Sequence, residues 1–218
     1  MERLLCVVMG YAFGLIQTGY IYGKVKKIDI RQHGSGNAGT TNALRVMGIK
    51  AGIITLLGDC LKAVAACVIA RVVIGGFCDI PDKLLALYAG LGAVLGHNFP
   101  FYLKFKGGKG IAATVGILFS IDWRIALISV ALFLVTLAIS HYVSMSSLVM
   151  MTSFFAVTIM FGIMGILFDG QDYMLIEAYV LTFVMAVMAF IRHKQNIVRL
   201  LNGNENKFSL KKKVEKTA

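Results

Sequence analysis

Two glycine-rich, cationic segments carry the residue types that bind phosphate. The first covers residues 34–45 and reads GSGNAGTTNALR, and the second covers residues 96–110 and reads GHNFPFYLKFKGGKG. Backbone amides that glycine leaves uncovered, next to Lys and Arg side chains, form the polar surface on which phosphate oxygens bind. Because both segments are bounded by long apolar runs, the pattern predicts a membrane protein that handles phosphorylated molecules.

The first segment combines a permissive backbone with many donors and acceptors. Helix propensity resumes at residue 43, so Thr41 or Asn42 is expected near a helix N-terminus, where anions are favoured. Arg45 can bind phosphate through two parallel hydrogen bonds. On composition alone, an ordinary polar loop explains this segment equally well. If it is a site, its candidate residues are Ser35, Gly36, Asn37, Thr41, Asn42 and Arg45.

The second segment places Lys109 among three glycines, directly before an apolar helical run. The positive-inside rule is enough to explain Lys104 and Lys106, but it does not explain a lysine within GGKG. The spacing GxxxxGK[ST] is absent, which argues against nucleotide hydrolysis. The candidate residues here are His97, Gly107, Gly108, Lys109 and Gly110.

Three further polar features lie at or within apolar runs. At the end of the last run, Arg192 and Lys194 are typical snorkelling residues, whereas His193 and Asn196 are not typical membrane anchors. The segment 141–147, which contains three serines, is either a tight turn or a source of hydroxyl donors. Asp59 and Lys62 share one helix face and form either a functional site or a structural ion pair.

Composition places these segments in a membrane. Hydrophobic residues make up 58% of the 218 residues, charged residues only 15%, and the mean hydropathy is +0.77. A helix needs about 20 apolar residues to cross the hydrocarbon core. The runs that satisfy this cover 4–23, 51–77, 84–103, 125–142, 148–168 and 174–191. A seventh run, 111–121, is short, so it extends toward residue 107, tilts, or crosses only part of the bilayer.

Loop charges select a topology. With seven crossings and an external N-terminus, the inner segments 24–50, 97–110, 143–147 and the tail from residue 192 hold 17 Lys and Arg, against 3 in the outer segments. Six crossings would put the basic tail outside, against the same rule. We therefore predict an all-α polytopic membrane protein of about seven transmembrane helices, with a short or tilted fourth helix, the N-terminus outside and the C-terminus cytoplasmic.

The predicted organisation is one membrane domain, residues 1–191, with cytoplasmic motif loops at 24–50 and 97–110. Residues 192–218 form the cytoplasmic end of the last helix and a basic tail attracted to lipid headgroups. The four cysteines lack CxxC spacing, which favours packing roles. With four histidines and no metal-ligand spacing, we predict no metal and no cofactor, and no nucleic-acid partner. The sequence gives no oligomeric state and is compatible with a monomer.

Three strings together resemble a known family. Residues 34–45, 96–114 and 192–205 (RHKQNIVRLLNGNE) are similar, in order and spacing, to the three signature motifs of the bacterial membrane-bound acyl-phosphate:glycerol-3-phosphate acyltransferases. The resemblance covers nearly the whole chain. It departs from the family pattern at Ala38, where proline is frequent, at Thr40, where alanine is common, and at His141, where arginine is frequent.

The resemblance implies an activity and a location. Members are inner-membrane enzymes that transfer a fatty acyl group from acyl phosphate to glycerol 3-phosphate, giving lysophosphatidic acid for phospholipid synthesis. It implies roles for Ser35, Arg45, Lys109, His193 and Asn196, with the family's cytoplasmic serine mapping onto Ser144. The substrates would be acyl phosphate and glycerol 3-phosphate, with membrane lipid around them.

The residues suit this reaction, because both substrates carry phosphate and two anion sites must converge. We expect Ser35 to orient a substrate by hydrogen bonding and not to form an acyl-enzyme. The general base stays open between His193, His97 and a phosphate oxygen of the donor. The main alternative, a transporter or scramblase of a phosphorylated solute, would place its site near mid-membrane on broken helices, usually with an internal repeat. No repeat is visible here.

Overall fold

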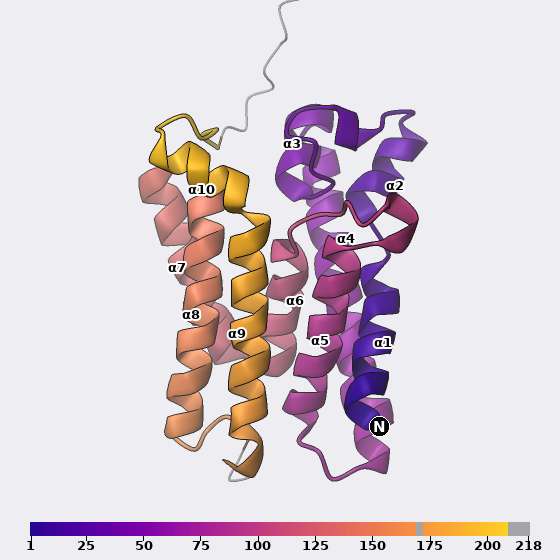
Figure 1. The fold of residues 1–218 in the computed structure, drawn as a ribbon, viewed down its shortest axis with the longest axis vertical. Helices are drawn as coiled ribbons and strands as arrows, with labels where there is room; N and C mark the ends of the chain where they lie inside the picture. The colour runs from indigo at the N-terminus through magenta and orange to yellow at the C-terminus, as the bar shows by residue number, and fades with distance from the viewer. Residues whose placement is uncertain (169–171, 209–218) are drawn as a thin grey trace, which may run out of the picture.

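The structure is a computed structural model and describes residues 1–168 and 172–208. Within these residues the chain is a bundle of α-helices without a β-strand (Figure 1). In chain order the helices are α1 (Glu2–Gly14), α2 (Thr18–Val25), α3 (Thr40–Met47), α4 (Ile49–Ile69), α5 (Asp82–Asn98), α6 (Ile111–Ile121), α7 (Trp123–Ser140), α8 (Val143–Ile163), α9 (Leu175–Arg192) and α10 (Lys194–Leu201). The predicted all-α polytopic class is confirmed.

In the described part of the chain, six helical segments are long and apolar enough to span a membrane. They correspond to the six long runs of the sequence. The short fourth helix is also present as α6, whose 11 residues extend over only about 17 Å, roughly half of a hydrocarbon core. It packs against α4, α5 and α7. The orientation of the termini stays a prediction.

The first span is not one continuous helix. Between α1 and α2, residues 15–17 leave the helical path, and Gln17 is 1% exposed. The predicted run 4–23 contained no proline to mark this break. At the end of α4 the chain continues through a π-helical turn, Ala70–Ile74, and a 3₁₀ turn, Gly75–Phe77. Hydropathy located both spans but not these internal changes of helix type.

Glycines allow α1 and α5 to pack at short range. A Cβ atom added at Gly10 would lie 2.0 Å from the Ala89 carbonyl oxygen, and one at Gly92 would lie 2.1 Å from the Val7 carbonyl oxygen. In lipid the hydrophobic effect contributes little to helix association, so the helices associate mainly through close van der Waals contact between their backbones. This pairing fixes the end of α5, from which the loop 97–110 begins.

The expected inner loop 143–147 is wrong. The structure joins α7 and α8 through His141, which is left-handed (φ 61°), and Tyr142, and α8 begins at Val143. Ser144 therefore sits in the first turn of α8. Residues 192–208 also do more than end a helix, because α10 lies across the upper end of the bundle (Figure 1). Most of the basic run 207–216 lies outside the described residues.

Candidate active site

One cavity of about 1180 Å³ lies where α3, α10 and the loop after α5 gather, at the upper end of Figure 1. It is lined by all four predicted catalytic residues, Ser35, Lys109, His193 and Asn196. The predicted binding residues that line it are Gly36, Asn37, Thr41, Asn42, Arg45, His97, Gly107, Gly110 and Ser144. Gly108 is the predicted residue outside this lining. Folding thus brings together Ser144 and the three motif segments, which are far apart in the chain.

Lys109 is held at the cavity wall by a chain of polar contacts. Its ammonium donates to Asn196 Oδ1, and Asn196 Nδ2 donates to Glu205 Oε1 at 2.6 Å. Glu205 also accepts from Ser144 Oγ at 3.1 Å and from Arg199 Nε at 2.6 Å. These contacts fix which side of the Asn196 amide faces the lysine. Glu205 was not among the predicted site residues, because its role depends on Ser144 of α8, which is far from it in the chain.

The charges in this chain of contacts depend on burial. Burial lowers the pKa of Lys109 to about 8, while Glu205 raises it and the nearby arginines, Arg199 first, lower it further. Burial acts in the opposite direction on Glu205 and raises its pKa, but hydrogen bonds from Asn196, Arg199 and Ser144 outweigh it and leave the pKa below its usual value. The result is a charged lysine that an anion would stabilise.

Close packing accounts for the glycines around Lys109. Gly107 N donates to Asn98 O at 3.2 Å and Gly108 N donates to His97 O at 3.1 Å. An added Cβ would lie 2.0 Å from His97 O at Gly107 and 2.0 Å from His97 Nε2 at Gly108. Gly110 has a left-handed φ of 80°. No larger residue fits the first two positions without moving the loop.

Arg192 clamps the same loop from the other side. Its guanidinium donates to Gly107 O at 3.0 Å and Gly108 O at 2.8 Å, and it stacks over the Phe99 ring. A snorkelling role for Arg192 is therefore wrong. The amides of Gly107 and Gly108 donate to carbonyl groups at the end of α5. Contrary to the expectation from sequence, they are therefore not available to a phosphate. The amides left for an anion are those of the first turn of α6.

In the first motif, Asn42 organises the loop. Its Oδ1 accepts from Ser35 N at 2.9 Å, and its Nδ2 donates to Ile30 O at 3.1 Å and His33 O at 3.0 Å. The expected helix start is confirmed, since α3 begins at Thr40. With its amide committed to the backbone, Asn42 supports the loop and leaves the exposed Ser35 hydroxyl at the cavity.

Arg45 lies in α3 and faces the cavity from the side of the first motif. Within residues 1–168 and 172–208 its side chain has no hydrogen bond and no ion pair. It is only partly exposed. A guanidinium in this position offers its donors to a ligand, and Lys109 supplies a second cation on the same cavity.

Comparison with known proteins identifies the family. Residues 4–203 match the family model described as glycerol-3-phosphate acyltransferase. The chain belongs to the glycerol-3-phosphate acyltransferase family. A relative from Alkaliphilus metalliredigens with that name is 40% identical over 215 residues, which cover 98% of this chain and 100% of the relative. Another, from Halalkalibacterium halodurans, is 40% identical over 209 residues, covering 95% of this chain and 96% of the relative.

Solved structures of this family agree. The crystal structure of PlsY (YgiH), described as an integral membrane glycerol 3-phosphate acyltransferase in its glycerol 3-phosphate form, matches with a TM-score of 0.81 and 31% identity, covering 96% of each chain. Its lysophosphatidic acid form matches with a TM-score of 0.79 and 30% identity, covering 96% of this chain and 97% of that one. The protein is thus an integral membrane glycerol-3-phosphate acyltransferase of the PlsY type, and the sequence resemblance is confirmed.

In this acyltransferase, His193 is held in one neutral tautomer. Its Nδ1 lies 2.8 Å from the Ala189 carbonyl oxygen and must carry the proton. Burial, followed by the charge of Lys109, lowers the pKa of His193 to about 4. The ring is therefore uncharged near pH 7, and its Nε2 keeps a lone pair for a hydrogen bond from a ligand.

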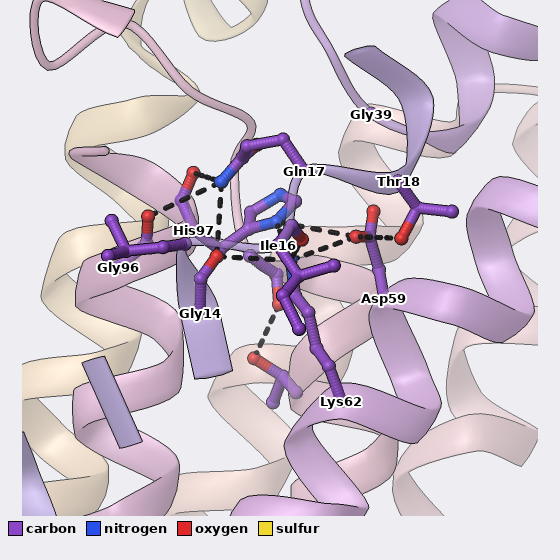
Figure 2. A network of polar contacts seen from close by, with 12 residues as sticks. Gly14, Ile16, Gln17, Thr18, Gly39, Asp59, Lys62, Gly96 and His97 are labelled. Carbon is purple, nitrogen blue, oxygen red and sulfur yellow. Dashed lines mark hydrogen bonds and ion pairs between the residues drawn. The ribbon is translucent and has the colours of Figure 1, made fainter. Parts of the chain in front are cut away.

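The ring of His97 is held in the opposite tautomer. Its Nδ1 lies 2.9 Å from Lys62 Nζ, and an ammonium group can only donate, so Nδ1 accepts and Nε2 carries the proton (Figure 2). Lys62 in turn pairs with Asp59 at 2.9 Å. With Nε2 already protonated and packed on Gly108, His97 has no lone pair to act as a base, which leaves two of the three candidates.

The acyltransferase cavity also has an apolar arm. It extends from the motif residues toward α7 and α8, where Leu134 is 57% exposed on the outer surface of the bundle. Its apolar lining residues are Leu56, Val115, Val130, Phe133, Leu134 and Met150. A cationic end joined to an apolar arm matches a ligand with a charged head and a hydrocarbon chain. Among the described residues, no group of His, Cys, Asp and Glu could hold a metal ion.

Proposed function

We propose that this protein transfers a fatty acyl group from acyl phosphate to the sn-1 hydroxyl of glycerol 3-phosphate. The products are lysophosphatidic acid and inorganic phosphate. One observation carries the proposal: segments 34–45, 97–110 and 192–208 line a single cavity with a cationic end and an apolar arm. The forms of the solved PlsY relative, named for glycerol 3-phosphate and lysophosphatidic acid, support the acceptor and the product.

Arg45 and Lys109 would hold the two phosphate groups, with Ser35 and the first turn of α6 adding neutral donors. When the acceptor hydroxyl attacks the acyl carbon, negative charge develops on the acyl oxygen and then on the leaving phosphate. Cations fixed in a half-buried site stabilise that charge more strongly than water does. Asn196 and Glu205 would keep Lys109 aimed at the cavity.

The chemistry of the reaction favours acyl phosphate as the donor. Acyl phosphate is an activated mixed anhydride, so alignment with the acceptor hydroxyl supplies much of the rate without a covalent enzyme intermediate. No cysteine lines the cavity among the described residues. The C–O bond to the acceptor forms as the C–O bond to phosphate breaks, and the acceptor's proton leaves with the phosphate product.

The tautomer and the low pKa of His193 bear on which group accepts the proton. A histidine with a pKa of about 4 is a weak base, whereas a phosphate oxygen takes a proton with a pKa near 6. We favour the donor's phosphate as the base, with His193 Nε2 accepting a hydrogen bond from the other glycerol hydroxyl and so orienting the acceptor. The role of His97 would then be structural.

The site would face the cytoplasm of a bacterial inner membrane. All motif segments gather at one end of the bundle (Figure 1), and that end holds most of the Lys and Arg outside the spans. Single cysteines at Asn202 and at Asp79, introduced into a cysteine-free variant, test this. A membrane-impermeant maleimide should label position 79 on intact cells and position 202 only after lysis.

The deciding experiment uses purified protein with labelled glycerol 3-phosphate and one of three donors: palmitoyl phosphate, acyl-CoA or acyl carrier protein. Lysophosphatidic acid formed with palmitoyl phosphate alone supports the proposal, and its regiochemistry reports the hydroxyl used. Product from another donor, or none from any, would refute it. An acylated Ser35 recovered after rapid quenching would refute direct transfer.

A further inference from the structure

A buried ion pair lies where the first span breaks between α1 and α2. Lys62 Nζ is 2.9 Å from Asp59 Oδ1, and the two side chains are 3% and 1% exposed. Thr18 Oγ1, at the start of α2, donates to the same Asp59 oxygen at 3.1 Å. Neither charged residue belongs to a family motif quoted above, and two buried charges are costly unless several contacts compensate them.

One set of compensating contacts is the broken helix itself. Lys62 Nζ donates to the carbonyl oxygens of Gly14, at 3.2 Å, and Ile16, at 2.5 Å. These groups lie at the C-terminal end of α1, where the helix dipole is negative and intrahelical partners are missing. A membrane interior makes an unpaired carbonyl especially costly. The ammonium therefore substitutes for the missing helical hydrogen bonds.

The second set of contacts leads toward the active site. Lys62 fixes the His97 ring through Nδ1, and Gln17 Nε2 donates to the His97 carbonyl oxygen at 3.0 Å and to that of Gly96 at 3.3 Å (Figure 2). The other edge of the ring, at Nε2, lies directly against Gly108. The helix break and the end of α5 are thus connected through one lysine.

The loop next to Lys109 is consequently held between two rigid groups. The His97 ring and backbone support Gly107 and Gly108 on one side, and Arg192 binds their carbonyl oxygens on the other. Lys109 is the next residue in the chain. A change in the position of the His97 ring would move the loop and with it the ammonium that faces the substrates.

We infer that the Asp59–Lys62 pair is a positioning unit for acyl transfer, acting through His97 and the glycine loop on Lys109. This inference rests on the proposed function, because it assigns to Lys109 the charge that stabilises the reacting groups. Asp59 borders the cavity, but the proposed effect passes through His97 and requires no contact between the pair and a substrate. It differs from a purely structural ion pair in one measurable respect: its effect on rate requires Lys109.

A double-mutant cycle tests that requirement. Asp59→Asn combined with Lys62→Met removes both charges, so no unpaired charge is left behind. In the wild-type background we expect these two substitutions to lower kcat/KM by about 10- to 100-fold, the loss expected when the Lys109 ammonium is displaced by about 1 Å. In a Lys109→Ala background the same change should cost less than about 3-fold. If the Asp59–Lys62 change lowers kcat/KM by the same factor in both backgrounds, the inference is overturned.

A variant of an ion pair at the opposite end of the bundle serves as the control for effects on folding. Arg71→Met removes a contact with Asp82 and should leave kcat/KM of the folded fraction unchanged. If the Asp59–Lys62 variant does not fold, His97→Gln takes its place in the cycle, and losses that multiply there overturn the inference as well. Wild-type activity is measured in parallel. If the wild-type enzyme is inactive with acyl phosphate, the proposed donor is refuted. The cycle is then run with the donor that the wild-type enzyme accepts.

Discussion

The two ends of the bundle treat their cations differently. At the end where α1 begins, Arg3 pairs with Glu177 at 2.6 Å and Arg71 pairs with Asp82 at 2.5 Å. At the cavity end, Arg199 and Arg31 are also paired, with Glu205 and Asp29. The side chains of Arg45, Lys104 and Lys106, which line the same cavity, make no hydrogen bond or ion pair within residues 1–168 and 172–208.

This difference separates two uses of charge. A cation whose hydrogen bonds are filled by a neighbouring carboxylate ties helices together and has little capacity left for a ligand. A cation without a carboxylate partner on a half-buried wall keeps that capacity. Lys109 is intermediate, since its contact is to the neutral amide of Asn196. Substitutions should therefore affect activity at one end and stability at the other.

The largest expected effect is that of Lys109→Ala. Removing the fixed positive charge beside the group on which negative charge develops lowers kcat by a factor of about 10² to 10³. Rates of lysophosphatidic acid formation on detergent-purified protein give this number directly. Lys83→Ala is the matched control, because Lys83 lies 3.6 Å from Asp122 at the other end. Similar rate losses in the two variants would remove the distinction between the ends.

Arg45→Ala should have the next largest effect, and it should act on substrate binding. The loss of hydrogen bonds to a charged group, at about 1.5–3 kcal/mol, corresponds to a rise in KM of about 10- to 100-fold. Because Arg45 has no protein partner in the described chain, its removal leaves no group unpaired, and thermal unfolding should be unchanged. A clear drop in unfolding temperature would show that Arg45 is structural.

The pH profile tests whether Lys109 acts as a cation. Its pKa of about 8 means that the ammonium is present below pH 8 and is lost as pH rises. We expect kcat/KM, which reports the free enzyme, to fall about tenfold per unit above pH 8. Lys109→Arg keeps its charge and should move this limb beyond pH 10. His193, with a pKa of about 4, adds no transition between pH 5 and 8.

The smallest effect on activity is expected from Glu177→Gln. This carboxylate accepts from Arg3 and, at 2.6 Å, from Tyr88. Both partners of the ion pair are about one-third exposed, so the loss in unfolding free energy should be about 1 kcal/mol or less. Specific activity of the folded protein should stay within about twofold of wild type. A larger kinetic effect would indicate coupling between the two ends.

The sequence predicted the parts of the fold that depend on local composition. The long spans follow from apolar runs, and the motif loops follow from glycine and charge. The break after Gly14 was missed because its stabilising groups, Lys62 and Gln17, are polar residues within apolar runs. The three serines of residues 143–147 predict a loop between two apolar runs. In α8, Ser146 and Ser147 bond to the carbonyl four residues earlier, at 2.9 and 2.7 Å.

The site was predicted as a set of residues but not as an arrangement. Glycine next to lysine indicated phosphate, yet the reason for Gly107 and Gly108 lies in their contact with His97. The position of Arg192 at the end of an apolar run predicts a membrane anchor, and nothing near it in sequence reveals the carbonyl groups it binds. Such contacts form between distant segments, so a single sequence carries no local signal for them.

The opening of the apolar arm at the side of the bundle has a consequence for the source of the donor. Since the apolar arm reaches the outer surface at Leu134, a fatty chain can move sideways between the cavity and one leaflet. Drawing a 16-carbon chain into water instead would cost about 12 kcal/mol at about 0.8 kcal/mol per methylene. The donor's abundance in the bilayer, and not its concentration in the aqueous phase, would then set how often the site is filled.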